Sequence, residues 1–150
     1  AHRASASLRY ERLFGEIMHL YGGSAHSIFN SEHSALDWRA LRARNDFAGL
    51  GYHSPNMQLA HGQRLRRGAT AYDQEAIATL ILSGRFIGFL PDHYAEAFVQ
   101  RGQMRAIAPA RLRYDCDFVS VLRRSPQPSR AALAFHAALL AAHASMTTDA

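Results

Sequence analysis

The sequence predicts an α/β fold with a mainly parallel sheet, and three observations between residues 70 and 102 support this prediction. Apolar residues at helical spacing end at Gly84, a residue that adopts the left-handed conformation without a steric penalty. A short apolar run, residues 86–90, then suits a strand covered on both faces. Pro91 opens a second helix. Its ring fixes φ near the helical value, and it lacks the N–H group that would have no partner in the first turn of a helix. Such α/β layers commonly bind ligands at the carboxyl ends of their strands.

Upstream of this stretch, residues 8–14 and 16–21 alternate, which predicts two extended segments with a bend at Gly15. Asp37 can cap a short helix over residues 37–43, and residues 47–53 predict the next strand. Residues 57–64 are ambiguous. Residues 67–72 predict a short strand, and Thr70 with Asp73 forms the capping pattern of a helix start.

Downstream, residues 104–108 predict a strand that Pro109 stops, and residues 112–123 alternate more clearly than any other segment. Cys116 lies on the apolar face of that alternation, which predicts a core thiol. Ser129 caps an alanine-rich helix that runs to about His143, and the last residues predict a frayed end.

The composition argues against several classes of function. At 150 residues the chain is one domain or two small lobes. The net charge is +5 and all 17 basic residues are arginine, but they are spread along the chain without an aromatic ladder, so we expect no nucleic-acid footprint within it. No apolar run approaches the ~20 residues that cross a bilayer, and the start lacks the pattern of a secretion signal. The single cysteine fits a reducing compartment.

The sequence offers no metal, cofactor or catalytic pattern. The nine histidines include no H-E-x-x-H pair, and one cysteine cannot build a cysteine-rich zinc site. The neighbouring carboxylates of Asp115 and Asp117 would disfavour a reactive thiolate at Cys116. Ser83 lacks the leading glycine of a G-x-S-x-G elbow. We therefore expect no enzyme activity, no metal and no cofactor.

Small and polar residues at strand and helix ends remain as candidate ligand contacts. They fall into two sets, Gly51, Tyr52, His53 and Ser54, and then Ser83, Gly84, Arg85 and Phe86. Small residues let backbone amides approach an anion, and arginine, histidine and hydroxyls orient a ligand by hydrogen bonds. The same residues also suit turns and core positions, and spacing alone does not favour either interpretation.

Five segments of the chain form an ordered set over about residues 3–143. They are L-x-Y-E-x-L-F-x-E at 8–16, LYGGSAHSIF at 20–29, DFAGLGYHSPN at 46–56, ILSGRFIGFLPDHYA at 81–95, and the final strand and helix. In this order they resemble successive parts of the carboxyl-terminal effector-sensing domain of LysR-type transcriptional regulators. The resemblance implies a bacterial ligand-sensing protein with two α/β lobes like those of type 2 periplasmic binding proteins. The second lobe, about 16–108, would be complete, whereas 1–15 and 109–143 would form crossings and part of the first lobe.

The resemblance also implies how the protein works. A small effector would bind in the cleft between the lobes, contacted by Gly51 to Ser54, by Ser83 to Phe86, and by Phe118 near the return crossing. Organic acids or aromatic metabolites are typical effectors, and Arg85 and His53 would suit a carboxylate. Binding would change the conformation of a cytoplasmic homodimer or higher homo-oligomer that contacts no membrane. It would contact DNA only through a helix-turn-helix domain absent from this chain. A periplasmic-type solute-binding protein is the alternative, and an α/β enzyme comes third.

Overall fold

The computed structural model describes residues 5–30, 41, 43, 46–52 and 55–144, which divide into two compact units. Unit 1 consists of Ala1–Glu16 and Cys116–Ala150, and unit 2 consists of Ile17–Asp115. Strand β1 (Leu8–Gly23) leads from unit 1 into unit 2, and strand β6 (Arg113–Arg123) leads back. Each unit is described below by itself.

Unit 2 contains the parallel strands that the sequence predicts. The sheet has the order β3-β2-β4-β1-β5, and β6 pairs with β1. Strand β2 (Phe47–Leu50) runs parallel to β3 (Arg67–Ala71) and to β4 (Ile87–Pro91), whereas β1 runs antiparallel to β4 and β5 (Met104–Ala106). The α/β class is therefore confirmed, but the sheet is mixed rather than mainly parallel.

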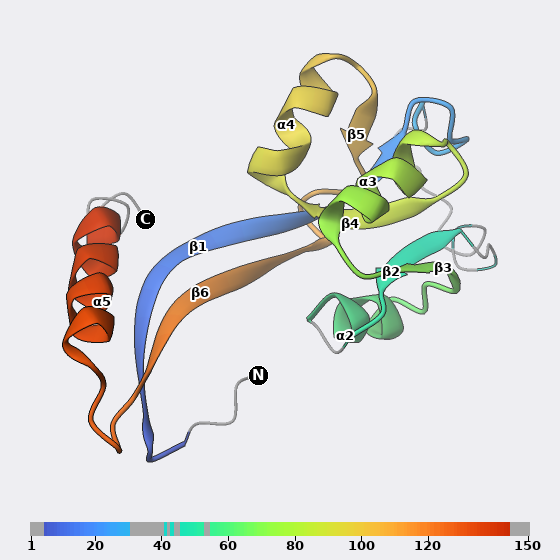
Figure 1. The fold of residues 1–150 in the computed structure, drawn as a ribbon. Coiled ribbons are helices and arrows are strands. Elements are labelled where there is room, and N and C mark those ends of the chain that lie inside the picture. Colours follow the sequence, from blue (N-terminus) through green and yellow to red (C-terminus); the bar gives the residue numbers. More distant parts are fainter. Residues whose placement is uncertain (1–4, 31–40, 42, 44–45, 53–54, 145–150) are drawn as a thin grey trace. The chain divides into compact units, whose positions relative to one another are not determined.

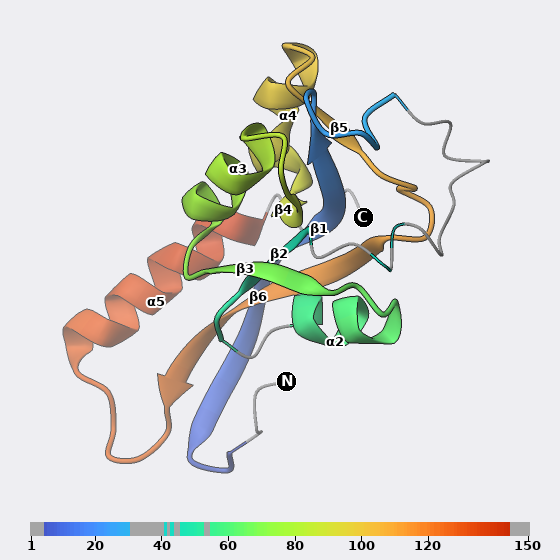
Figure 2. The same ribbon diagram turned by 90° about the vertical axis from the view of Figure 1, so that its right-hand side faces the viewer.

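Helices cover both faces of this sheet. Helices α3 (Gln74–Leu82) and α4 (Asp92–Gln100) lie on one face, and α2 (Pro55–Gly62) lies on the other (Figures 1 and 2). Residues 57–64, which the sequence left ambiguous, thus fall mostly in α2. Alternating side chains of β2 serve the two faces, since Ala48 and Leu50 join the core under α3 and α4 while Phe47 faces α2. Ile77, Ile81, Leu90, Ala95 and Met104 complete the buried cluster under α3 and α4.

The central helix, strand and helix form largely as predicted. Gly84 and Gly102 have φ values of +72° and +68°, a conformation that favours glycine where each helix ends. Pro91 is the N-cap of α4. The start of α3 differs from the prediction, because Thr70 belongs to β3 and Asp73 is the N-cap, its carboxylate accepting from the amide of Ala76 at 2.7 Å.

The predicted bend at Gly15 is wrong, since β1 is one continuous strand. A Cβ atom at this position would lie 2.9 Å from Nη2 of Arg12. Arg12 forms an ion pair with Asp117 of β6 at 2.8 Å, and glycine leaves room for its guanidinium. The glycine therefore accommodates a cross-strand ion pair rather than a bend.

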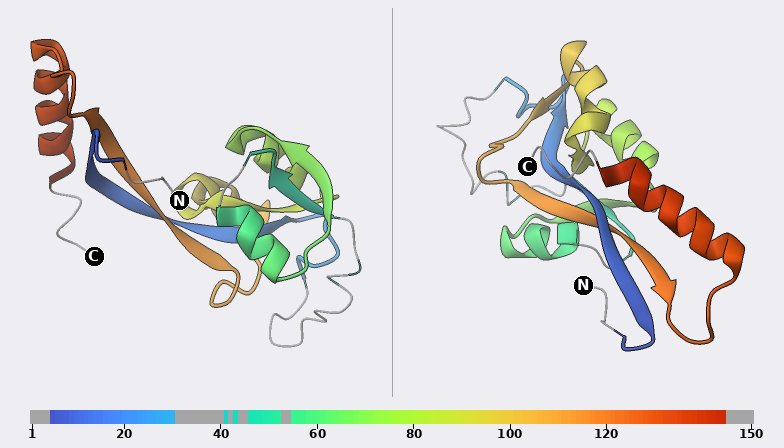
Figure 3. Two further views of the ribbon diagram at one scale, coloured as in Figure 1. Left: turned by 90° about the horizontal axis from the view of Figure 1, so that it is seen from below. Right: turned by 90° about the vertical axis from the view of Figure 1, so that its left-hand side faces the viewer.

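Unit 1 contains the outer parts of β1 and β6 together with α5 (Arg130–His143), which lies beside them (Figure 3). As predicted, Ser129 caps α5, its hydroxyl accepting from the amide of Ala132 at 3.2 Å. Cys116 is half-buried rather than enclosed in a core.

Three predicted segments extend beyond the described residues. Strand β2 ends at Leu50, before the predicted end at 53, and Gly51 and Tyr52 form a bend. Of the predicted helix over 37–43, only Leu41 and Ala43 are described, and both are helical. The frayed end expected after His143 lies mostly outside the described residues.

Candidate functional site

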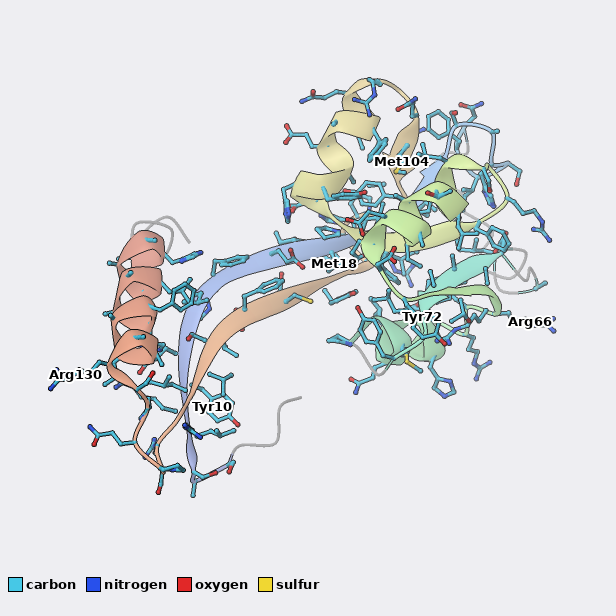
Figure 4. All side chains as sticks on the ribbon, viewed as in Figure 1. Tyr10, Met18, Arg66, Tyr72, Met104 and Arg130 are labelled. Carbon is cyan, nitrogen blue, oxygen red and sulfur yellow. The ribbon has the colours of Figure 1, made fainter. Side chains whose placement is uncertain are left out.

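The carboxyl ends of the three parallel strands of unit 2 lie at one edge of the sheet, here called the carboxyl edge. Gly51 and Tyr52 follow β2, Tyr72 follows β3, and Asp92 follows β4. Because β2 is parallel to both neighbours, these residues lie side by side at that edge. Tyr72 is labelled in Figure 4. One of the two predicted sets of contacts, Gly51 and Tyr52, is therefore at the edge where ligands of α/β folds commonly bind.

Two exposed tyrosines make this edge aromatic. The exposed fraction is 74% for Tyr72 and 49% for Tyr52. The Tyr72 ring lies against the backbone of Gly51, where an added Cβ would be 2.6 Å from its Cε1 atom. The amide of Gly51 donates to the carbonyl of Ala71 at 2.8 Å, which fixes the two strand ends together. Glycine at position 51 thus leaves room for the ring to lie across the strand end.

Helix starts supply the charges at the carboxyl edge. The carboxylate of Asp73 is used in capping α3. At α4 the cap residue, Pro91, has no side-chain hydrogen bond, and the amide of His93 donates to Oδ1 of Asp92 at 2.7 Å. Carboxylates near helix N-termini are favourably placed in the field of the helix.

Ser83 to Phe86, the other predicted set, lies at the opposite edge of the sheet. These residues precede β4, whose first residue Ile87 is in register with Phe47 at the start of β2. The four residues of β2 separate the two sets by about 13 Å. The structure does not bring the two predicted sets together.

At that opposite edge, hydrogen bonds and packing within the turn explain why these residue types occur there. The hydroxyl of Ser83 donates to the carbonyl of Leu80 at 2.6 Å and accepts from the amide of Arg85 at 3.2 Å. A Cβ atom on Gly84 would lie 2.5 Å from that of Ala25. The guanidinium of Arg85 lies 5.5 Å from the centre of the Phe86 ring. This turn closes α3 and packs against the end of β1.

The remaining predicted contacts lie elsewhere. Phe118 belongs to unit 1, where its ring stacks on Phe14 at 4.6 Å, and Phe14 in turn stacks on His143 at 5.5 Å. Phe118 keeps 42% of its surface exposed. His53 and Ser54 lie outside the described residues.

Sequence reasoning missed a hollow of about 420 Å³ beside α4, here called the α4 hollow. It lies within unit 2 and is lined by Tyr21, Asp92, His93, Glu96, Val99 and Gln100. Burial, and to a lesser degree the Asp92 carboxylate, raise the pKa of Tyr21 to about 12, so its hydroxyl stays protonated at neutral pH. No sequence motif joins Tyr21 to α4, because they meet only through the pairing of β1 with β4.

A smaller hollow of about 210 Å³ lies under α2 and is lined by Phe47, Met57, Ala60, His61, Leu65 and Arg67.

Among the described residues, no group of three or more histidine, cysteine, aspartate or glutamate side chains could hold a metal ion. No helix among the described residues is long and apolar enough to cross a membrane.

Comparison with known proteins establishes the family. Residues 1–144 match the LysR substrate binding domain, and the chain belongs to this family. Such domains are the ligand-sensing parts of transcriptional regulators rather than enzymes, which confirms the resemblance inferred from the sequence and the expectation that the chain is not an enzyme.

Particular relatives agree with this assignment. The chain is 33% identical over 124 residues to the HTH-type transcriptional activator BauR of Pseudomonas aeruginosa, a match that covers 83% of this chain and 40% of BauR. Full-length HypT of Salmonella typhimurium, a hypochlorite-specific LysR-type regulator, has a similar fold, with a TM-score of 0.70, 15% identity, and coverage of 94% of this chain and 48% of that one. LysG of Corynebacterium glutamicum with bound effector Arg gives a TM-score of 0.68 at 16% identity and covers 95% of this chain and 49% of that one. The chain thus spans less than half the length of these relatives.

Proposed function

We propose that this chain senses a small metabolite for a LysR-type transcriptional regulator and that the effector binds at the carboxyl edge of unit 2. The observation that carries the proposal is the pair of exposed tyrosines beside Gly51. Tyrosine provides an apolar ring face together with a hydroxyl that can donate or accept, a combination common in binding sites. In this proposal the carboxyl edge forms one wall of an inter-lobe cleft, and the first lobe provides the other.

The chemistry of the carboxyl edge favours an effector with a flat or aromatic group. Tyr52 and Tyr72 offer ring faces for stacking. Arg85, which would suit a carboxylate, belongs to the opposite edge. An aromatic metabolite therefore fits the described residues better than a simple organic acid held by Arg85.

Effector binding would act on a larger assembly. The full-length protein would bind DNA through a helix-turn-helix domain, as the name of the relative BauR indicates for that protein. We propose that it acts in the cytoplasm as a homodimer or higher homo-oligomer. A change in lobe angle or dimer packing would transmit the effector signal, because an effector shifts an equilibrium only when it binds one conformation better.

The proposal is tested by substitutions at the two edges. Metabolites that stabilise the protein are first found by thermal shift, since a ligand at 100 times its dissociation constant stabilises by about 2.7 kcal/mol. Tyr72→Ala should then weaken binding of an effector about tenfold, because a stacking face is lost.

Ser83→Trp provides the comparison at the opposite edge. Binding that survives Ser83→Trp but not Tyr72→Ala would support the carboxyl edge. The reverse pattern would move the site to Ser83 to Phe86. Consumption of the metabolite during the titration would contradict a purely sensing role.

A further inference from the structure

We infer that the α4 hollow is a binding site for a small organic cation, whose ammonium or guanidinium group is held between the Tyr21 hydroxyl and the carboxylates of Asp92 and Glu96. The hollow lies beside α4 over β1 and includes neither Gly51 nor Tyr52. The hollow shares Asp92 with the carboxyl edge, but not the two tyrosines on which the effector proposal rests.

The charge of the hollow is opposite to that of the whole chain. The chain carries 17 arginines and a net charge of +5, yet none of the described arginines lines this hollow, and two carboxylates do. Asp92 and Glu96 are four residues apart on α4 and so lie on the same side of the helix. Like charges on neighbouring turns destabilise a helix slightly, and a bound cation would relieve that repulsion.

An independent observation at Tyr21 also indicates a ligand. The residue is only 4% exposed, and its hydroxyl makes no hydrogen bond with any of the described residues. The hydroxyl oxygen is not among the fully buried atoms that lack a partner, so the tip of this otherwise buried side chain opens into the hollow. Since Tyr21 lines the hollow, a ligand there can supply the missing hydrogen bond.

The acceptors match the donors of an ammonium group. An ammonium has three N–H donors, and the Tyr21 oxygen with one oxygen from each carboxylate gives three acceptors. Other neighbours leave these acceptors available, because Gln100 occupies Oε1 of Glu96 at 3.1 Å and His93 takes Oδ1 of Asp92, so each carboxylate retains its second oxygen. The volume of about 420 Å³ is sufficient for a small metabolite.

Three compounds with the same four-carbon skeleton test the inference. 1,4-Diaminobutane is cationic, 1,4-butanediol is neutral, and succinate is anionic. Calorimetric titration at low salt measures affinity, and amide chemical shifts locate the binding. We expect the diamine alone to bind saturably and to shift the amides of α4 and Tyr21, with an affinity that falls as salt is added.

Conservative variants test the named atoms. Glu96→Gln and Asp92→Asn each remove one charge and should weaken diamine binding about fivefold, and Tyr21→Phe should also weaken it. Glu75→Gln, which removes an exposed carboxylate in the first turn of α3, is the matched control and should have no effect. Circular dichroism verifies that each variant is folded.

Some results would overturn the inference. These are equal binding of diamine and diol, shifts outside α4 and Tyr21, or equal weakening by Glu75→Gln and Glu96→Gln, which would indicate diffuse attraction to acidic residues. Tyr72→Ala should leave diamine binding intact, so failure at the α4 hollow is distinguishable from failure of the effector proposal.

Discussion

At the scale of single residues, close backbone contacts determine which glycines can be replaced. A Cβ atom on Gly23 would overlap the carbonyl oxygen of Ile81, which is backbone and cannot rotate away, whereas a Cβ atom on Gly62 would meet nothing within 4 Å. We predict that Gly23→Ala destabilises the protein by about 3 kcal/mol or more, because β1 and the end of α3 must move apart. Gly62→Ala, the control, should be neutral or slightly stabilising. Urea denaturation measures both, and equal stabilities would contradict the packing described.

Tyr21 gives a prediction for alkaline pH. An unfolded tyrosine ionises near pH 10, whereas the pKa of Tyr21 in the folded protein is about 12. The stability that the neutral Tyr21 hydroxyl contributes is therefore complete below pH 10 and is lost as pH rises from 10 towards 12, by at most about 2–3 kcal/mol. Tyr21→Phe should remove this part of the decline when urea denaturation is compared at pH 8 and pH 11. Tyr72→Phe, at an exposed position, should retain it; loss of the decline in both variants would show that Tyr21 is not its source.

At the scale of elements, the side chain that caps α3 gives a local prediction. The Asp73 carboxylate accepts from the amide of Ala76 at 2.7 Å. Asp73→Ala should cost about 1 kcal/mol and increase hydrogen exchange in the first turn of α3, whereas Asp73→Asn should retain most of the stability because it keeps an acceptor oxygen. Equal losses in the two variants would mean that the charge matters rather than the cap.

The elements that the sequence predicted best are those marked by local signals. Gly84, Pro91 and Gly102 act on their own turns, so the helices and the strand around them could be predicted from neighbouring residues. Gly15 was misinterpreted because the side chain for which it leaves room, that of Arg12, is held by an ion pair with Asp117, a residue that is distant in sequence. Helix α2 was missed because residues 57–64 show only weak periodicity.

Strand direction limited the prediction of the site. Gly51 and Ser83 both follow a strand or a helix, and sequence spacing alone does not show at which edge of the sheet each residue lies. The parallel pairing of β2 with β4 distinguishes them, because Gly51 follows a strand while Ser83 to Phe86 precede one. The α4 hollow required the antiparallel pairing of β1 with β4, which brings Tyr21 near residues some seventy positions later.

At the scale of the whole molecule, the chain combines a unit with its own sheet and helices and a second, smaller unit. Unit 2 has a continuous apolar core under α3 and α4. Among the described residues of unit 1, the most exposed large apolar side chain is that of Phe135 on α5, at 70%. The effector proposal therefore depends on unit 2, where strands, helix starts and tyrosines meet at one edge.

Hydrogen–deuterium exchange with and without an effector identified by thermal shift tests the central claim most directly. Binding protects the backbone amides that it orders, so protected peptides locate the site. The account predicts protection at the carboxyl edge, in the peptides that contain Gly51 and Tyr52, Tyr72 and Asp73, and the first turn of α4. Protection confined to Ser83 to Phe86 and the neighbouring end of β1 would contradict it.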